Sequence, residues 1–156
     1  MRTLRSASLT LVVTLLAACA PLPPAGITGT AAQREANRQT VLAFYEQGLN
    51  QKNADAALRY VGPRYIQHNP TAADGPEGFR AFVGFMRQKF PQSHGEIKRS
   101  FVEGDYVVLH VHAVREPGTA GTAIVDIFRL ENGKIVEHWD VIQPVPEKAA
   151  NGNGMF

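Results

Sequence analysis

Three polar side chains within apolar segments are the residues of this sequence best suited to chemistry. Asp126 lies in one run rich in Val, Ile and Phe, and His138 and Asp140 lie in a second such run shortly after it. A carboxylate in an apolar cavity loses hydration, which raises its pKa and makes it a usable general base near neutral pH. A neighbouring imidazole can orient this base or stabilise an enolate oxygen. These residues therefore predict proton abstraction beside a carbonyl group.

Two other interpretations of these residues stay open. The polar groups can satisfy one another and serve only the structure, as such clusters often do. Several His and Asp side chains can also bind zinc or iron, but His110 and His112 are not accompanied by a compact ligand motif. We therefore predict no metal and no cofactor. The sequence also has no glycine-rich phosphate loop and no serine elbow motif.

A hairpin over residues 123–143 must position the polar groups. Its two strand-like runs flank Glu-Asn-Gly, and Asn-Gly between such runs is a strong hairpin signal. If Gly133 is the left-handed residue of a bulge, Leu130 pairs with Lys134 and the strands run antiparallel from there. The register of the hairpin therefore depends on the conformation of this turn.

Alternation along the two strands then decides which side chains share a face. The predicted register places Asp126 opposite His138 and Ile124 opposite Asp140. A two-residue turn would shift the register by one residue and separate Asp126 from Asp140. The residues predicted on the common face are Ile124, Asp126, Phe128, Val136, His138 and Asp140.

Residues 106–115 predict a further strand with one wholly apolar face. Its other face carries His110 and His112 among valines, as the wall of a pocket would, although either histidine alone can equally be a satisfied core group. We expect His68 to join the polar cluster. The residues expected to line the cavity beside that cluster are Tyr65, His110, His112 and Phe128.

The elements before the hairpin predict an α+β fold. Helical spacing of apolar residues and capping signals such as Asn53 predict three helices. The expected helices cover residues 31–50, 54–60 and 75–90. The expected strands cover residues 94–102, 106–115 and the hairpin, after a short extended segment at residues 65–70. A strongly curved antiparallel sheet wrapped over about three N-terminal helices would bury these apolar faces.

The N-terminal residues have the composition of a targeting segment. Arg2 and Arg5 precede an apolar run that is too short to span a bilayer. Leu-Ala-Ala before Cys19 resembles a bacterial lipobox, which implies a signal peptide over residues 1–18 and lipidation of Cys19. With Ala20 after it, this implies a lipid anchor in the outer membrane, facing the periplasm. An ordinary secretory signal is the alternative.

One domain follows this leader. We expect a flexible Pro- and Gly-rich linker at residues 19–30, a single domain at residues 31–147 and a tail at residues 148–156. The end of the tail either frays or folds back with Met155 and Phe156 on apolar surface. Outside the leader, 14 basic residues balance 14 acidic ones, so the charge gives no reason to expect nucleic acid binding.

Several motifs resemble those of SnoaL-like proteins, which belong to the nuclear transport factor 2-like superfamily. The motifs are Tyr65-Ile-Gln-His68-Asn69-Pro, Asp74-Gly-Pro-Glu-Gly-Phe79, Val125-Asp126-Ile-Phe-Arg, Asn132-Gly-Lys-Ile-Val-Glu-His138-Trp139-Asp140 and the final Asn-Gly-Met-Phe156. The resemblance covers the domain from about residue 31 onward. It implies a cone-shaped barrel with a hydrophobic cavity and a homodimer formed through the sheet.

The resemblance also assigns roles. In polyketide cyclases of this family an aspartate of the final strand is the general base of an aldol closure, and Asp140 matches it. Their second polar residue, a histidine, falls on Asp126, so this sequence departs from them. Two carboxylates in one pocket raise one pKa or need a cationic partner, for which His68 and His138 are candidates.

Two functions are therefore expected. The first is an envelope-anchored lyase or isomerase that acts on a small apolar carbonyl compound, with Asp140 as base and with Asp126, His68 and His138 assisting. The second is a non-catalytic lipoprotein whose cavity binds an apolar ligand, or whose sheet face, with Trp139, binds a protein partner.

Overall fold

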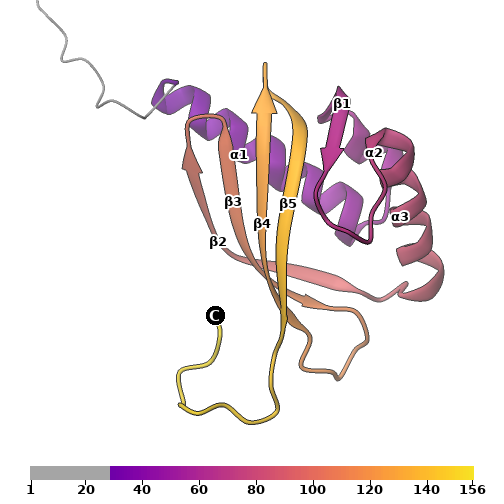
Figure 1. The fold of residues 1–156 in the computed structure, drawn as a ribbon, viewed down its shortest axis with the longest axis vertical. Helices are drawn as coiled ribbons and strands as arrows, with labels where there is room; N and C mark the ends of the chain where they lie inside the picture. The colour runs from indigo at the N-terminus through magenta and orange to yellow at the C-terminus, as the bar shows by residue number, and fades with distance from the viewer. Residues whose placement is uncertain (1–28) are drawn as a thin grey trace, which may run out of the picture.

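A five-stranded sheet and three α-helices form the part of the chain that the structure describes, residues 29–156 (Figure 1). This computed structural model leaves the predicted signal peptide and the predicted lipidation of Cys19 outside the described residues. The elements in chain order are α1 (Ala31–Tyr45), the π-helical η1 (Glu46–Asn50), α2 (Ala54–Leu58), β1 (Val61–Gln67), α3 (Gly75–Lys89), β2 (His94–Glu103), β3 (Tyr106–Val114), β4 (Thr122–Glu131) and β5 (Lys134–Pro144). Within the described residues, no helix is both long and apolar enough to cross a membrane.

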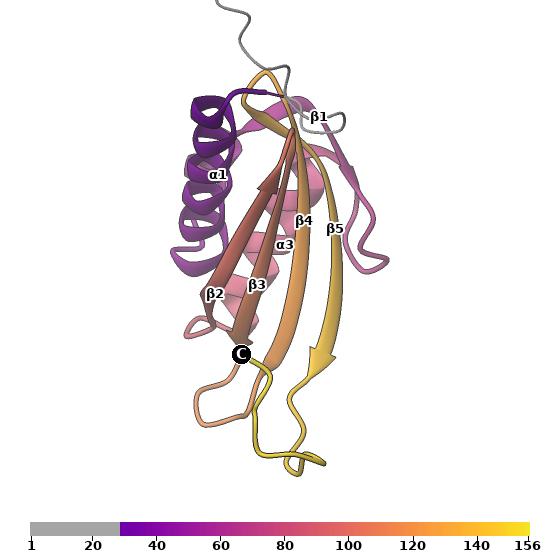
Figure 2. The same ribbon diagram turned by 90° about the vertical axis from the view of Figure 1, so that its left-hand side faces the viewer.

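The strands follow the order β1-β5-β4-β3-β2 across the sheet. Strands β2 to β5 pair antiparallel, whereas β1 pairs parallel with β5, so the sheet is mixed. The extended segment expected at residues 65–70 overlaps β1, which already begins at Val61. The sheet curls over the helices without closing into a barrel (Figure 2). The predicted α+β fold with a curved sheet is therefore confirmed, but the sheet is open and not purely antiparallel.

Side-chain caps explain where the first two α-helices begin. The Thr30 hydroxyl accepts a hydrogen bond from the Gln33 N–H at 3.1 Å at the start of α1. The Asn53 side chain accepts one from the Ala56 N–H at 3.0 Å at the start of α2, as its position in the sequence predicts. The helix expected over residues 31–50 consists of α1 and a final π-helical turn, η1.

The hydrophobic core lies between the sheet and the helices. Val107, Leu109 and Val111 of β3 are fully buried there, on the strand face that the sequence predicts to be wholly apolar. The Phe44 ring of α1 lies 4.9 Å from the Phe79 ring of α3, measured between centroids. We call this core side the inner face of the sheet. The alternate residues of β3 lie on the outer face.

The turn of the β4–β5 hairpin differs from the prediction. Asn132 and Gly133 both have positive φ, 51° and 72°, and Glu131 pairs directly with Lys134. The connection is therefore a two-residue turn, because Asn-Gly accepts positive φ at both central positions. The predicted pairing of Leu130 with Lys134 is wrong.

A bulge in β5 restores the predicted face. Arg129 pairs with Glu137 and Leu130 pairs with Ile135, which leaves Val136 as an extra residue in β5. Because turn and bulge each shift the register by one residue, the two shifts together preserve the alternation of side chains.

The two shifts change which polar residues face each other. Asp126 lies directly opposite Asp140, and Phe128 lies opposite His138. The predicted pairs of Asp126 with His138 and of Ile124 with Asp140 are therefore wrong. The predicted common inner face for these side chains is nevertheless found.

Candidate active site

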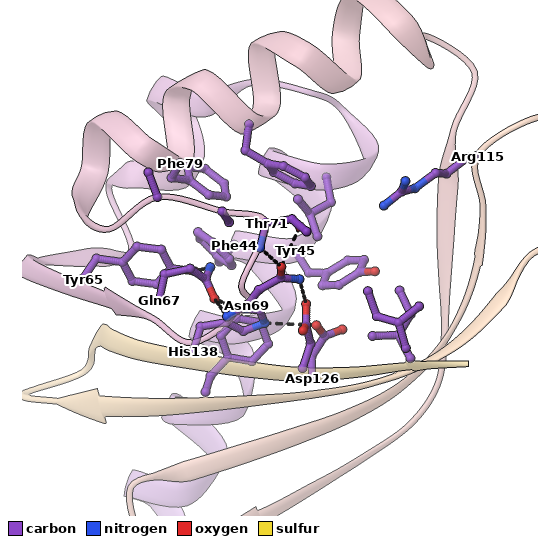
Figure 3. Close-up of a pocket in the computed structure, with 18 residues that line it drawn as sticks. Phe44, Tyr45, Tyr65, Gln67, Asn69, Thr71, Phe79, Arg115, Asp126 and His138 are labelled. Atoms are coloured by element: carbon purple, nitrogen blue, oxygen red, sulfur yellow. Dashed lines mark hydrogen bonds and ion pairs between the residues drawn. The ribbon is translucent and has the colours of Figure 1, made fainter. Parts of the chain in front are cut away.

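A cavity of about 100 Å³ opens between the inner face of the sheet, helices α1 and α3 and the loop between β1 and α3 (Figure 3). Most of its wall is apolar. Its polar wall residues are Tyr45, Tyr65, Gln67, Asn69, Thr71, Arg115, Asp126, His138 and Asp140. Four residues predicted to lie at a common site, Asp126, His138, Asp140 and Tyr65, thus share one cavity, and Phe128 lies in its apolar wall.

Asp126 is the most deeply buried carboxyl group of the site. Its Oδ1 lies 3.0 Å from His138 Nε2, while its Oδ2 is buried and has no hydrogen-bond partner among residues 29–156. Burial raises the pKa of Asp126, and His138 opposes this rise in part through its hydrogen bond and its charge. The negative charge of Asp140 raises the same pKa further.

The hydrogen bonds around Gln67 determine the tautomer of His138. Gln67 Oε1 accepts a hydrogen bond from the Asn69 backbone N–H at 2.9 Å, so the oxygen of this amide is identified. The same oxygen lies 2.9 Å from His138 Nδ1, which must therefore carry a hydrogen and donate it.

This tautomer places a shared proton between His138 and Asp126. A neutral His138 that carries its hydrogen on Nδ1 presents only a lone pair from Nε2 to Asp126 Oδ1, and two lone pairs at 3.0 Å repel each other. A proton on either atom removes the conflict. The buried pair therefore holds one proton and has no net charge.

Asp140 has a different environment. Asn69 Nδ2 donates a hydrogen bond to Asp140 Oδ2 at 2.5 Å. The orientation of the Asn69 amide is set by Thr71, whose backbone N–H and hydroxyl donate to Asn69 Oδ1 at 2.8 and 2.7 Å. Asp140 is only partly buried and lines the cavity. It is thus a carboxylate held as an acceptor and open to a ligand.

The end of β1, which carries Gln67, and the loop after it, which carries Asn69, are tied to their neighbours. The Asp74 carboxylate at the start of α3 accepts a hydrogen bond from the Gln67 N–H at 2.7 Å. The backbone N–H of His68 donates to the His138 carbonyl at 2.9 Å. These bonds hold the two amide side chains over β5, where they reach His138 and Asp140.

Sequence reasoning missed Gln67 and Asn69 and chose their neighbour, His68. The structure places the His68 ring on the other side, stacked on the Trp139 ring at 4.6 Å, with Nε2 2.9 Å from Glu137 Oε1. The prediction that His68 joins the cluster is wrong. Alternation from Tyr65 would have assigned residues 67 and 69 to the cavity and His68 to the opposite side.

His110 and His112 also lie outside the cavity, so their assignment to its wall is wrong. They are on the outer face of β3, because the apolar alternate residues of that strand occupy the core. The Phe156 ring covers them, with its centroid 5.4 Å from that of His110 and 4.4 Å from that of His112. The C-terminal tail therefore folds back onto the sheet.

Tyr45 is a further polar group of the cavity, and no pattern in the sequence marks it as a site residue. It is 3% exposed and lines the cavity, with its ring near Asp126 in Figure 3. Burial, and to a lesser extent the charge of Asp126, raises the pKa of Tyr45 far above its ordinary value. Its hydroxyl group therefore stays protonated and can donate a hydrogen bond to a ligand.

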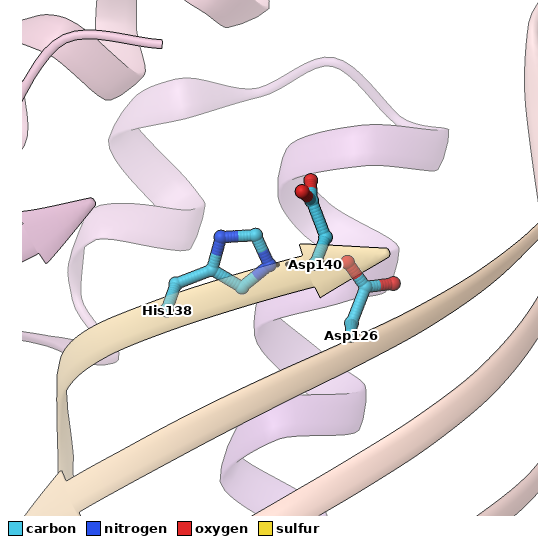
Figure 4. A group of neighbouring side chains, drawn as sticks. All are labelled: Asp126, His138 and Asp140. Carbon is cyan, nitrogen blue, oxygen red and sulfur yellow. Dashed lines mark hydrogen bonds and ion pairs between the residues drawn. The ribbon is translucent and has the colours of Figure 1, made fainter. Parts of the chain in front are cut away.

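The cluster also contains enough donor atoms for a three-ligand metal site. Asp126, His138 and Asp140 each offer one atom, and these atoms lie within 4.8 Å of one another (Figure 4). Carboxylate and imidazole together suit iron, manganese or zinc. The shared proton already explains the close approach of Asp126 to His138, so this geometry does not require a metal, and its absence stays a prediction.

The comparisons with known proteins agree with this architecture. Residues 41–138 match the SnoaL-like domain family. No curated protein sequence shows significant similarity to the chain. Among solved structures, a candidate SnoaL-like polyketide cyclase from Jannaschia sp. CCS1 is similar with a TM-score of 0.60 and 22% identity, over 74% of this chain and 90% of that one.

Two further structures show the same fold. TsrD from Streptomyces laurentii is similar with a TM-score of 0.59 and 22% identity, over 70% of this chain and 89% of that one. A candidate polyketide cyclase from Bacillus cereus is similar with a TM-score of 0.62 and 19% identity, over 73% of this chain and 78% of that one. The solved structures show that the chain has a nuclear transport factor 2-like fold, and because the domain family matches more than half of the chain, this protein belongs to the SnoaL-like family.

Proposed function

We propose that this protein is a lyase or isomerase that removes a proton beside the carbonyl group of a small substrate, with Asp140 as the general base. The observation that carries this proposal is the difference between the two aspartates. Asp126 is buried and shares a proton with His138, whereas Asp140 is open to the cavity and accepts a hydrogen bond from Asn69. Paired carboxylates in such different environments are typical of acid–base sites.

The neutrality of the buried pair of Asp126 and His138 supports Asp140 as the base. If Asp126 and Asp140 were both anionic, each would hinder ionisation of the other, because like charges in an apolar cavity repel strongly. The proton that Asp126 shares with His138 removes one of these charges. Asp140 then carries the negative charge of the cluster and can accept a proton from the substrate.

The proposed reaction begins with transfer of a carbon-bound proton to Asp140. The electron pair of the broken C–H bond forms an enolate, and the Tyr45 hydroxyl donates a hydrogen bond to its oxygen. In an isomerisation, Asp140 returns the proton to another carbon. In an elimination, Asp140 gives it to the leaving hydroxyl group, which departs as water.

Deuterium exchange tests this proposal without knowledge of the natural substrate. We expect the protein to accelerate exchange of the α-protons of acetone, a ketone small enough for this cavity, in D2O, followed by NMR. Asp140→Asn should lower the rate by about 100-fold or more, as loss of a general base does. Asp105→Asn, in the exposed turn before β3, is the matched control. No acceleration by the wild-type protein, or equal rates for wild type and Asp140→Asn, would contradict the proposal.

A second role, association with a protein partner, is favoured by the outer face of the sheet. Phe101, Tyr106, Val125 and Val141 are 59%, 44%, 39% and 67% exposed there. We propose this face as the contact of a homodimer, since exposed apolar patches of this kind mark interaction sites. Lipidation of Cys19 and an outer-membrane location complete the proposal. Sedimentation of the wild type and of Val141→Asp should show a dimer that the variant loses.

A further inference from the structure

Arg115 stands at the mouth of the cavity. It follows directly after β3 and is the only Arg or Lys among the described residues that line the cavity. Figure 3 shows its guanidinium group pointing toward the cavity. The group lies 5.6 Å from the centroid of the Phe90 ring, at the end of α3. Such a cation–π contact helps to hold the side chain at the mouth.

Arg115 is one of five arginines among residues 29–156 that form no ion pair, and it alone of these five lines the cavity. Arg38, Arg80 and Arg129 each form an ion pair with Asp or Glu. None of the ion pairs formed within residues 29–156 includes Arg115. Its guanidinium is therefore available to an anionic group of a ligand, for which its planar donors suit a carboxylate best.

The charges of the cavity give a ligand one favourable orientation. Asp140 is negative and lies on β5, whereas Arg115 is positive and lies at the mouth. A carboxylate on the ligand is attracted to Arg115 and repelled by Asp140. The uncharged part of the ligand, with its carbonyl group and acidic C–H bond, then reaches the base.

The size of the cavity limits the ligand further. Its volume of about 100 Å³ is below the roughly 150 Å³ of an apolar cavity known to hold benzene. This volume favours a short carbon chain over a ring system.

We propose that the substrate is a small oxo acid whose carboxylate is bound by Arg115 while its carbonyl end lies beside Asp140. This inference rests on the proposed function and adds the chemical class of the substrate. Arg115 is then a specificity-determining residue. It discriminates between the anion and an uncharged ketone of the same size.

Calorimetric titration of the full chain with two isosteric probes tests the inference. The probes are acetoacetate, which carries the carboxylate, and acetylacetone, which does not. We expect wild type to bind acetoacetate at least about tenfold more tightly, as one charge-assisted hydrogen-bonded contact provides. Arg115→Gln should remove this preference and leave binding of acetylacetone unchanged. Arg87→Gln, which changes an exposed arginine of α3 outside this cavity, should retain the preference.

Three results would overturn the inference: equal affinity of wild type for both probes, no binding of either, or unchanged acetoacetate affinity in Arg115→Gln. The base is tested separately by Asp140→Asn. This variant should still prefer acetoacetate but lose exchange of its α-protons. If Asp140→Asn exchanges protons as fast as wild type while Arg115 still selects the anion, the proposed base is wrong and the anion site stands.

Discussion

The free energy of unfolding should report directly on the buried carboxyl group of Asp126. This side chain is 5% exposed, and within the described residues its Oδ2 has no hydrogen-bond partner. Asp126→Asn keeps the shape of the side chain and removes its charge. The Asn amide can donate to His138 Nε2, which presents a lone pair because Nδ1 carries the hydrogen.

The sign of the effect follows from the raised pKa of Asp126. In the unfolded chain this group loses its proton near pH 4, whereas the folded protein retains it to a higher pH. Between these two pKa values the unfolded state has released a proton that the folded state still holds, so wild-type stability falls as pH rises. Below this window the group contributes its full stability, and above the folded pKa the loss is complete.

The Asn variant does not suffer this loss. Each unit by which the folded pKa exceeds the unfolded value corresponds to about 1.4 kcal/mol of stability lost by wild type at high pH. Asp126→Asn removes the charge, although its amide oxygen stays without a partner where Oδ2 was, so we expect the variant to be more stable than wild type at pH 8 by about 1.4 kcal/mol for each such unit. The difference should shrink toward pH 4.

Urea unfolding between pH 4 and pH 9 measures this difference. Asp105→Asn, which changes an exposed aspartate, is the control and should follow wild type at every pH. A variant that is less stable than wild type at pH 8, or a difference that does not change with pH, would refute the account of a buried carboxyl group that retains its proton.

Three further changes test the supporting contacts. Gln67→Met removes the acceptor of His138 Nδ1 and should cost about 1–3 kcal/mol of stability; nitrogen NMR of the imidazole should also show the tautomer change, and an unchanged spectrum would contradict the assignment. Gly95→Ala places a Cβ 2.6 Å from the Tyr45 hydroxyl oxygen, so overpacking should lower the free energy of unfolding by about 1–3 kcal/mol, measured by thermal unfolding. A neutral effect would show that the tyrosine side chain moves freely. Phe156→Ala should change stability by less than about 1 kcal/mol but speed proteolysis of the tail, since this ring is its contact with the outer face; unchanged proteolysis would refute that role.

Local patterns explain how much of the fold was predictable. Helical spacing and capping by Asn53 depend on near neighbours, and the two faces of β3 follow from alternation. The turn was less predictable. Asn132 and Gly133 are compatible with either a two-residue turn or a bulge, and nothing in the sequence around Val136 marks it as the extra residue of β5. The shared inner face was predicted correctly although the predicted turn and the predicted strand pairs were wrong. The two-residue turn and the bulge at Val136 each shift the register by one residue, and together they preserve the alternation of side chains.

The sequence by itself determined the chemistry that is available: carboxylates and an imidazole on two apolar strands, within a recognisable SnoaL-like pattern. Only the tertiary structure decided which groups meet. Gln67 and Asn69 reach β5 because β1 adds to the sheet in parallel, a long-range pairing that no local signal encodes. Likewise, only the tertiary structure shows that Asp126 is buried whereas Asp140 is partly open to the cavity. Desolvation of a carboxyl group depends on the packing of the whole domain rather than on adjacent residues.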